Sequence, residues 1–393
     1  MASHTGHSAV PDESAHHQAF LTEVFGPLHR VEQRRWARAY LHGLLHSPGK
    51  KTPRNMARTD RLPPAAAHGL HQFVNASTWA WEPVRRRLAL WVAAGAAPYA
   101  WTVAELIIPK RGEHSVGVHR VTDPATGRTV NAQRAVGLFL VTDTHCHPVD
   151  WSLVLDGVWG RDRDRRLRAR IPSHETARPV GAHVVDHAAG VMAHPLMPRL
   201  PWALDLTRGH DAGGVLAGLA RHTAGLVCEV DPGQVVISGH RAPTVTTVGG
   251  LFEQRRFRQP YVMTRDMVDG RHRAVTVHTY AGTVRLPRRR DTGGVSGAHG
   301  YRLLEVVDPT TRQPGRYWIT SVADRRVEKV LLLMRSRTTL QKALDALQER
   351  FGVLDFEGRS FPGWHHHMTM ASAAYVYHHL HGGPGATAAR AAG

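Results

Sequence analysis

The sequence is poor in cysteine, in acidic residues relative to basic ones, and in long apolar runs. Two cysteines, Cys146 and Cys228, occur among 393 residues, which excludes a disulfide framework and suits a reducing compartment. No apolar run approaches the roughly 20 residues that cross a bilayer, so we expect neither a membrane span nor a membrane partner. We also expect no signal peptide at the start of the chain. These absences predict a soluble cytoplasmic protein.

Positive charge, by contrast, is abundant. Lys and Arg number 50 against 32 Asp and Glu, which gives a formal net charge of +18 with histidine neutral. A basic surface of this size favours a polyanionic partner, most often nucleic acid. The alternative is that the arginines serve only solubility. The sequence contains no Walker loop, dinucleotide fingerprint, nucleophile elbow or Cys-x-x-Cys pair.

The pattern of apolar residues divides the chain into helical, mixed and strand-rich parts. Helical periodicity dominates first, with Ser77 as a plausible N-cap. Strands follow, then helix, strand, helix and strand, and finally a basic strand-rich stretch. The predicted parts are a disordered tail at 1–17, a helical domain at 18–96, a mixed core at 97–232, a basic β-rich insertion at 233–334, a closing segment at 335–381 and a disordered tail at 382–393.

The closing segment begins with a clear helix pattern. Leu340, Leu344, Leu347 and Phe351 form one apolar stripe, and Gly352 supplies a C-terminal stop. The stretch that follows, FEGRSFPGWHHH, gathers a carboxylate, an arginine, aromatic rings and three histidines in what we expect to be a turn-rich segment. A helix with a polar row leading into such a segment indicates a site.

This closing segment resembles that of DDE transposases from insertion sequences, in particular the group named after insertion sequence 701. Further matching stretches are HQFVNASTWAW, PKRGEHSVGV and PVDWSLVL, and the resemblance covers roughly residues 20–380. It implies an α/β protein with an RNase H-like core, a mixed five-stranded sheet with helices. It also implies an N-terminal helical domain that contacts DNA and a β-rich insertion before the closing helix.

The family's chemistry needs three carboxylates that hold two Mg²⁺ ions for phosphodiester displacement. Aligned on the shared motifs, the three acid positions fall on Ala104, Asp205 and Gln341. Glu105 is a carboxylate, but strand alternation points it to the opposite face from Ala104. Two of three acids are therefore replaced, which predicts that the ancestral Mg²⁺ sites are lost and that the protein needs no cofactor.

Two further family positions, an Arg and a Lys of the closing helix, fall on Arg337 and Gln348. Asp205, Arg337, Glu357 and His365 are the candidates for a remaining or repurposed site, but for Glu357, Arg359 and the three histidines a role as a structural buttress is favoured over a functional one. Two histidine groupings, His183 with His187 and His145-Cys146-His147, have some resemblance to metal-binding patterns, but neither pattern is specific.

These observations predict a transposase-derived, duplex-DNA-binding protein without cleavage or strand-transfer activity. One alternative is an enzyme that uses the former cleft for acid–base chemistry on a small molecule; another is an active transposase that uses Glu105. A homodimer is compatible with each of these functions. The expected DNA contacts are basic residues of the helical domain, the first strand and the insertion: Arg85, Arg86, Lys110, Arg111, Arg255, Arg256, Arg288 and Arg289.

Overall fold

The computed structural model describes residues 13–59, 62, 66–122, 126–207, 211–223, 225–239, 242–254, 258–268, 271–287, 300–308, 315–322 and 327–382. The chain forms two compact units. One combines Met1–Ala96 with Leu347–Gly393, and the other is Ala97–Ala346. The predicted tails at 1–17 and 382–393 fall mostly outside the described residues.

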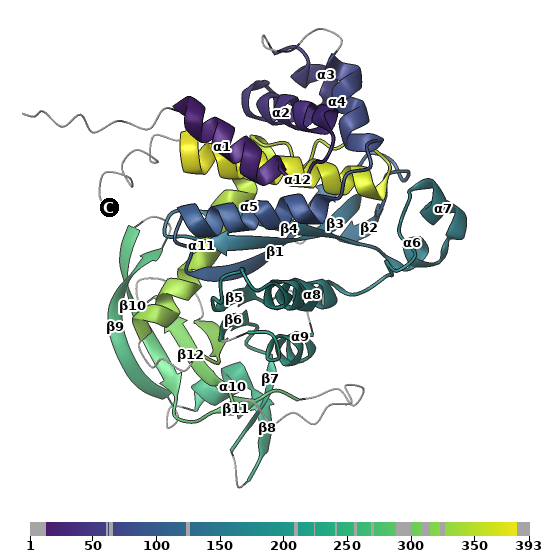
Figure 1. Ribbon diagram of the computed structural model, residues 1–393. Helices are drawn as coiled ribbons and strands as arrows, with labels where there is room; N and C mark the ends of the chain where they lie inside the picture. The colour runs from purple at the N-terminus through teal and green to yellow at the C-terminus, as the bar shows by residue number, and fades with distance from the viewer. Residues whose placement is uncertain are drawn as a thin grey trace, which may run out of the picture. The chain divides into compact units, whose positions relative to one another are not determined.

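The first unit is helical and is built around its last long helix (Figure 1). Helix α12 (Phe361–Tyr377) contacts α2, α4 and α5, and every residue from Gly363 to Val376 is buried. A helix that is buried on all sides belongs in a core. The surrounding elements are α1 (Glu13–Phe25), α2 (Val31–His46), α3 (Pro53–Met56), α4 (Ala66–Asn75) and α5 (Trp81–Gly95), and the π-turn η2 (His378–Gly382) extends α12.

The histidine-rich stretch differs from the turn-rich segment that the sequence indicated. Ser360 accepts a hydrogen bond from the amide of Gly363 and starts helix α12, with Pro362 in its first turn. The ring nitrogens of His366 each lie 2.8 Å from a carbonyl oxygen, one of Val74 and one of Trp79. This stretch therefore packs with the N-terminal helices, and the predicted closing segment at 335–381 is divided between the two units.

The closing helix α11 (Val327–Glu349) begins earlier than its apolar stripe suggested. The predicted stop is present, because Gly352 adopts a left-handed φ of +69° just after the helix. Similarly, the helical run expected from residue 18 onward is interrupted, and α1 and α2 are separate helices on either side of Gly26 to Arg30.

The second unit contains the predicted RNase H-like core. Strands β1 (Ala100–Pro109), β3 (Thr129–Val141), β4 (Cys146–Val154), β5 (Trp202–Asp205) and β6 (Leu226–Val230) lie in the order β4-β3-β1-β5-β6. Strands β1, β5 and β6 run parallel, whereas β3 is antiparallel to both β1 and β4. This is the mixed five-stranded sheet that the sequence predicted.

Helices connect the parallel strands of this core. Helix α8 (Val180–Ala193) precedes β5 and packs against β3 and β4, and α9 (Ala212–Leu219) leads from β5 to β6 and packs against α8. Two short helices, α6 (Gly157–Arg161) and α7 (Arg163–Arg168), follow β4 in the chain. No helix in the described part of the chain is long and apolar enough to cross a membrane.

The β-rich insertion extends the core sheet. Strand β13 (Arg316–Thr320) pairs antiparallel with β6, and β12 (Arg302–Val307), β10 (Arg271–Tyr280) and β9 (Arg258–Val268) continue the same sheet. A second, small sheet consists of β7 (Val235–Ser238), β8 (Thr244–Thr247) and β11 (Val284–Arg285). Helix α10 (Val248–Glu253) directly follows β8 in the chain. On the far side of the core, β2 (His119–Thr122) pairs with β3. The pairing with β6 brings the insertion beside the position of the expected active site.

Candidate active site: carboxylates held by arginines

The candidate site lies where the parallel strands β5 and β6 end. Asp205 is the last residue of β5, and in the parallel register it lies opposite Glu229 of β6. Side chains of register partners on neighbouring strands share a face of the sheet. Two carboxylates are therefore adjacent at the carboxyl end of the sheet, although the sequence had indicated Asp205 alone.

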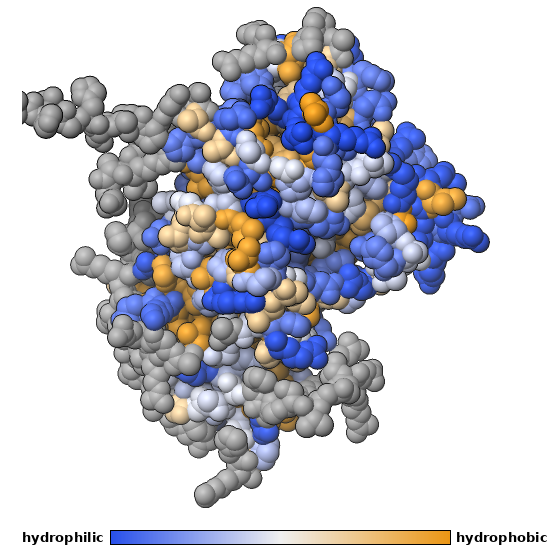
Figure 2. Space-filling view, viewed as in Figure 1, coloured by the Kyte–Doolittle hydropathy of each residue, from blue (hydrophilic) through white to orange (hydrophobic). Residues whose placement is uncertain are grey.

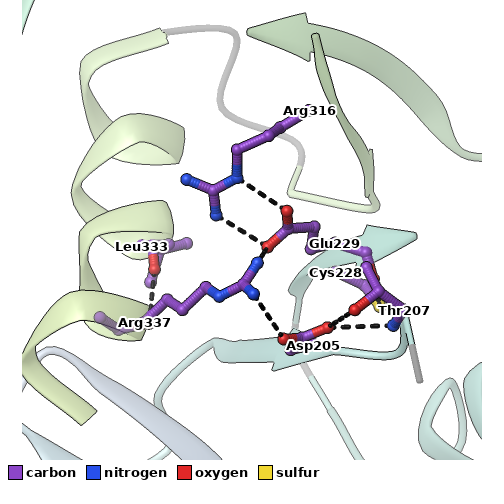
Figure 3. A network of polar contacts seen from close by, with 8 residues as sticks. Asp205, Thr207, Cys228, Glu229, Arg316, Leu333 and Arg337 are labelled. Atoms are coloured by element: carbon purple, nitrogen blue, oxygen red, sulfur yellow. Dashed lines mark hydrogen bonds and ion pairs between the residues drawn. The ribbon is translucent and has the colours of Figure 1, made fainter. Parts of the chain in front are cut away.

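Asp205 already has partners on both of its carboxylate oxygens. Its Oδ1 accepts hydrogen bonds from the amide of Thr207 at 3.0 Å and from the Thr207 hydroxyl at 2.6 Å. Its Oδ2 lies 3.3 Å from Nη2 of Arg337, which projects from α11 (Figure 3). Asp205 therefore binds the loop that follows its strand and, through Arg337, the closing helix.

Glu229 is more deeply buried and more strongly paired than Asp205. The residue is 4% exposed, and Arg316 of β13 donates to both of its oxygens, from Nε and Nη2, each at 2.7 Å. Arg337 donates from Nη1 to the same carboxylate. Bidentate arginine–carboxylate pairs of this kind are among the strongest hydrogen bonds in proteins. Figure 3 shows Arg337 placed between the two carboxylates.

This cluster is electrically balanced within itself. Two guanidinium groups, of Arg316 and Arg337, face two carboxylates, of Asp205 and Glu229. Cys228 directly precedes Glu229 in β6. Burial, followed by the charges of Asp205 and Glu229, raises the pKa of the Cys228 thiol well above its ordinary value. The thiol is therefore protonated and is not a nucleophile.

The donor set does not fit a two-metal centre. Ala104 is buried and offers no oxygen. Gln341 is exposed, and its amide Nε2 donates to Asp345 at 2.8 Å, one turn further along α11. Among the described residues, no group of three or more His, Cys, Asp or Glu side chains could hold a metal ion. A hard divalent cation takes oxygen ligands, and each carboxylate oxygen of Asp205 and Glu229 already has a partner within the chain.

Glu105, the other acid of the first strand, has a separate partner. Nη2 of Arg134 on β3 lies 2.8 Å from its Oε1, and Nε of Arg134 donates to the same oxygen at 2.9 Å. Successive residues of a strand point to opposite faces, so Glu105 does not occupy the face of Ala104. This pairing disfavours Glu105 as a replacement acid.

Comparison with known proteins agrees with the architecture. The sequence matches the DDE superfamily endonucleases over residues 23–277, which is more than half of the chain. The chain belongs to the DDE endonuclease superfamily. No curated protein matches the sequence significantly. The matched region includes the strands that carry Ala104, Asp205 and Glu229 of this DDE endonuclease family member.

The other predicted site residues lie in the helical unit, not in the unit of Asp205. Glu357 is exposed in the turn before α12. His365 is buried, stacks on Trp81 with ring centroids 4.5 Å apart, and accepts a hydrogen bond from Arg85 at its Nδ1. Gln348 belongs to the same unit. These contacts are those of a residue that packs and stabilises the helical unit.

Among the predicted DNA contacts, Arg85 requires correction. The residue is 3% exposed and donates to the hydroxyl of Thr369, the carbonyl of His365 and that residue's ring. A buried guanidinium that joins α5 to α12 cannot contact phosphate. Arg86 and Arg111 are exposed and Lys110 is half-buried. Arg255, Arg256, Arg288 and Arg289 lie outside the described residues.

The His183–His187 pair was a weak metal candidate. His187 Nδ1 lies 3.5 Å from Asp150, and its Nε2 lies 3.3 Å from the Ser152 hydroxyl on β4 and from the carbonyl of Val136. The order hydroxyl, imidazole, carboxylate is that of a nucleophilic triad, but both distances exceed the 2.6–3.2 Å typical of a working pair. We assign these contacts to the packing of α8 on the sheet.

His183 is 2% exposed on the same helix. Burial, followed by the charges of Arg178 and His187 and opposed by Asp186, lowers its pKa from 6.5 to about 4. In the second histidine grouping, burial lowers the pKa of His145 and raises that of Cys146, while His147 is 1% exposed.

Proposed function

We propose that this DDE endonuclease family member, which has features of the insertion sequence 701 group, binds duplex DNA and no longer cleaves or joins it. The observation that carries the proposal is the arginine pairing of Asp205 and Glu229. In a two-metal enzyme, metal ions supply the positive charge next to the carboxylates. Here guanidinium groups supply it, and Ala104 and Gln341 occupy the other two acid positions.

DNA binding is supported by charge and by ancestry. The net charge of +18 favours a polyanion, and phosphate contacts from Lys and Arg provide most of the affinity in sequence-independent binding. Such a protein would act as a DNA-binding regulator, or would be a decayed copy of a mobile element. The acid–base alternative has less support, because both oxygens of Asp205 have partners and His365 is buried in contact with Trp81 and Arg85.

Two measurements on the full chain test the proposal. Binding to labelled duplex DNA, measured by fluorescence anisotropy over a range of salt concentrations, should show affinity that falls steeply as salt rises. Supercoiled plasmid incubated with the protein and Mg²⁺ or Mn²⁺ should stay intact. Metal-dependent nicking that disappears in Asp205→Asn would refute the loss of cleavage, and the absence of any duplex binding would refute the DNA-binding role.

A further inference from the structure

The two short helices α6 and α7 form a corner in which a side chain caps the start of each helix. Asp156 caps α6 by accepting from the amides of Val158 and Trp159, each at 3.1 Å. Asp162 both ends α6 and caps α7, since its side chain accepts from the amide of Arg165 at 2.9 Å. Caps of this type fix the start of a helix. The sequence RDRDRRLR is therefore a defined corner and not a loose loop.

Side chains anchor this corner to the core. Trp159 is buried, and its indole Nε1 donates to the carbonyl of Val118 at 2.8 Å. Arg166 donates to three carbonyls, those of Trp159 at 3.1 Å, Pro172 at 2.8 Å and Glu175 at 2.7 Å. The guanidinium of Arg165 lies over the Trp159 ring, 5.2 Å from its centroid. Two of the arginines thus hold the helices in place.

The remaining surface of the corner combines positive charge with one large apolar side chain. Arg161, Arg163, Arg168 and Arg170 are exposed. Leu167 stands among them and is 77% exposed, the highest value among the exposed large apolar side chains of the described chain. Figure 2 shows this region as a strongly hydrophilic surface that carries a small apolar patch. Over residues 156–170, six arginines and three aspartates give a net charge of 6 − 3 = +3.

A leucine on a rigid basic support has a recognised use in DNA binding. Proteins that kink the duplex insert an apolar side chain between base pairs from the minor groove while nearby Lys and Arg hold the phosphates. A membrane surface is a poorer fit, since interfacial helices present a continuous apolar face, and no residue of α7 is buried while Leu167 is its one apolar residue. The charge and the isolated leucine therefore favour duplex DNA.

We propose that the corner formed by α6 and α7 is a DNA-binding surface in which Leu167 wedges between two base pairs and Arg163 and Arg168 contact the flanking phosphates. This inference rests on the proposed DNA-binding function and names a surface that carries it. The wedge bends the duplex at its point of insertion, and the cost of unstacking a step is offset by the additional contacts of the bent DNA.

The test compares variants of the full chain on one duplex that carries fluorophores at its two ends, so that anisotropy reports binding and energy transfer reports bending. Leu167→Ala should bind about tenfold more weakly, because one buried leucine is lost from the complex, and it should not bend the duplex. Leu196→Ala is the matched control, since Leu196 is 70% exposed in the same unit, and it should behave as the wild type.

The arginines are tested by the dependence of affinity on salt. The double variant Arg163→Gln/Arg168→Gln should reduce the steepness of the log–log plot by about two, one for each lost phosphate contact. The control Arg128→Gln/Arg199→Gln removes the same charge from exposed positions in the same unit and should reduce it by much less. A parallel sedimentation assay with anionic phospholipid vesicles distinguishes a membrane surface from DNA.

The outcomes separate the two proposals. If the wild type does not bind duplex DNA, both the proposed function and this surface are overturned. If the wild type binds but Leu167→Ala and the Arg163/Arg168 variant match their controls, the surface is wrong and the function stands. Binding of wild-type protein to vesicles, abolished in Leu167→Ala, would overturn the DNA assignment of Leu167.

Discussion

Replacing Arg316 and Arg337 should lower the free energy of unfolding far more than replacing Arg316, Arg337 and Glu229 together. In the double variant Arg316→Met/Arg337→Met, the carboxylate of Glu229 stays 4% exposed but loses the partners of both oxygens. A buried charge without compensation typically costs about 3–5 kcal/mol. We expect a loss at the lower end of that range, because the arginine side chains are 50% and 40% exposed and leave room for water.

Adding Glu229→Leu to this double variant should restore most of the lost stability. Replacing a buried ion pair by apolar residues is often neutral or stabilising, so the triple variant should unfold within about 1 kcal/mol of the wild type. Asp205 remains in this variant and keeps its hydrogen bonds from Thr207. Urea denaturation followed by tryptophan fluorescence measures each free energy of unfolding. The control is Arg178→Met, which removes one partner of a largely exposed pair with Asp186 and should cost less than about 1 kcal/mol.

Mn²⁺ adds a second readout to the same variants. When the guanidinium groups are gone, Asp205 and Glu229 are adjacent carboxylates without a counter-charge, so Mn²⁺ should stabilise the double variant and leave the wild type unchanged. The reasoning is refuted if the double variant is as stable as the wild type, or if the triple variant is no more stable than the double.

Two other predictions concern buried cations and histidines. Because the pKa of His183 is about 4 in the folded chain against an ordinary value of 6.5, the unfolded state binds the proton first, and stability present above pH 6.5 is lost as the pH falls toward 4. The stability lost through His183 is about 2 kcal/mol at pH 5. The variant His183→Leu should not show this loss, whereas the exposed control His174→Leu should still show it. Acid titration monitored by circular dichroism measures the difference. Arg85→Met should lower the free energy of unfolding by about 3 kcal/mol, because it leaves buried acceptors without a donor, whereas the exposed neighbour Arg86→Met should change it by less than about 0.5 kcal/mol in urea denaturation.

The core fold could be predicted from the sequence because its signals are local. Alternating and continuous apolar runs indicated β1, β3, β4, β5 and β6, and the position of Gly352 matched the end of α11. The prediction of a turn-rich segment for the histidine-rich stretch was wrong, because three consecutive histidines are a polar pattern typical of turns. In the structure their rings find carbonyl, hydroxyl and guanidinium partners inside a helical core, and such partners come from distant parts of the chain.

The partner of Asp205 could not be predicted for a similar reason. Glu229 lies in an apolar strand, LVCEV, and an acid within such a strand was a usable signal, because a buried carboxylate needs a cation. The identity of that cation depended on two long-range pairings, β6 with β13 and α11 with the ends of β5 and β6. Neither pairing has a signature in local spacing.

The arginine cluster also bears on how the carboxyl end of an RNase H-like sheet accommodates two neighbouring acids. Adjacent carboxylates at the ends of parallel strands repel each other unless a cation neutralises them. In this chain Arg316 comes from the β-rich insertion and Arg337 from the closing helix, and together they neutralise Glu229 and Asp205. The counter-charge is thus part of the protein itself, and it comes from two elements that are far from β5 and β6 in the sequence.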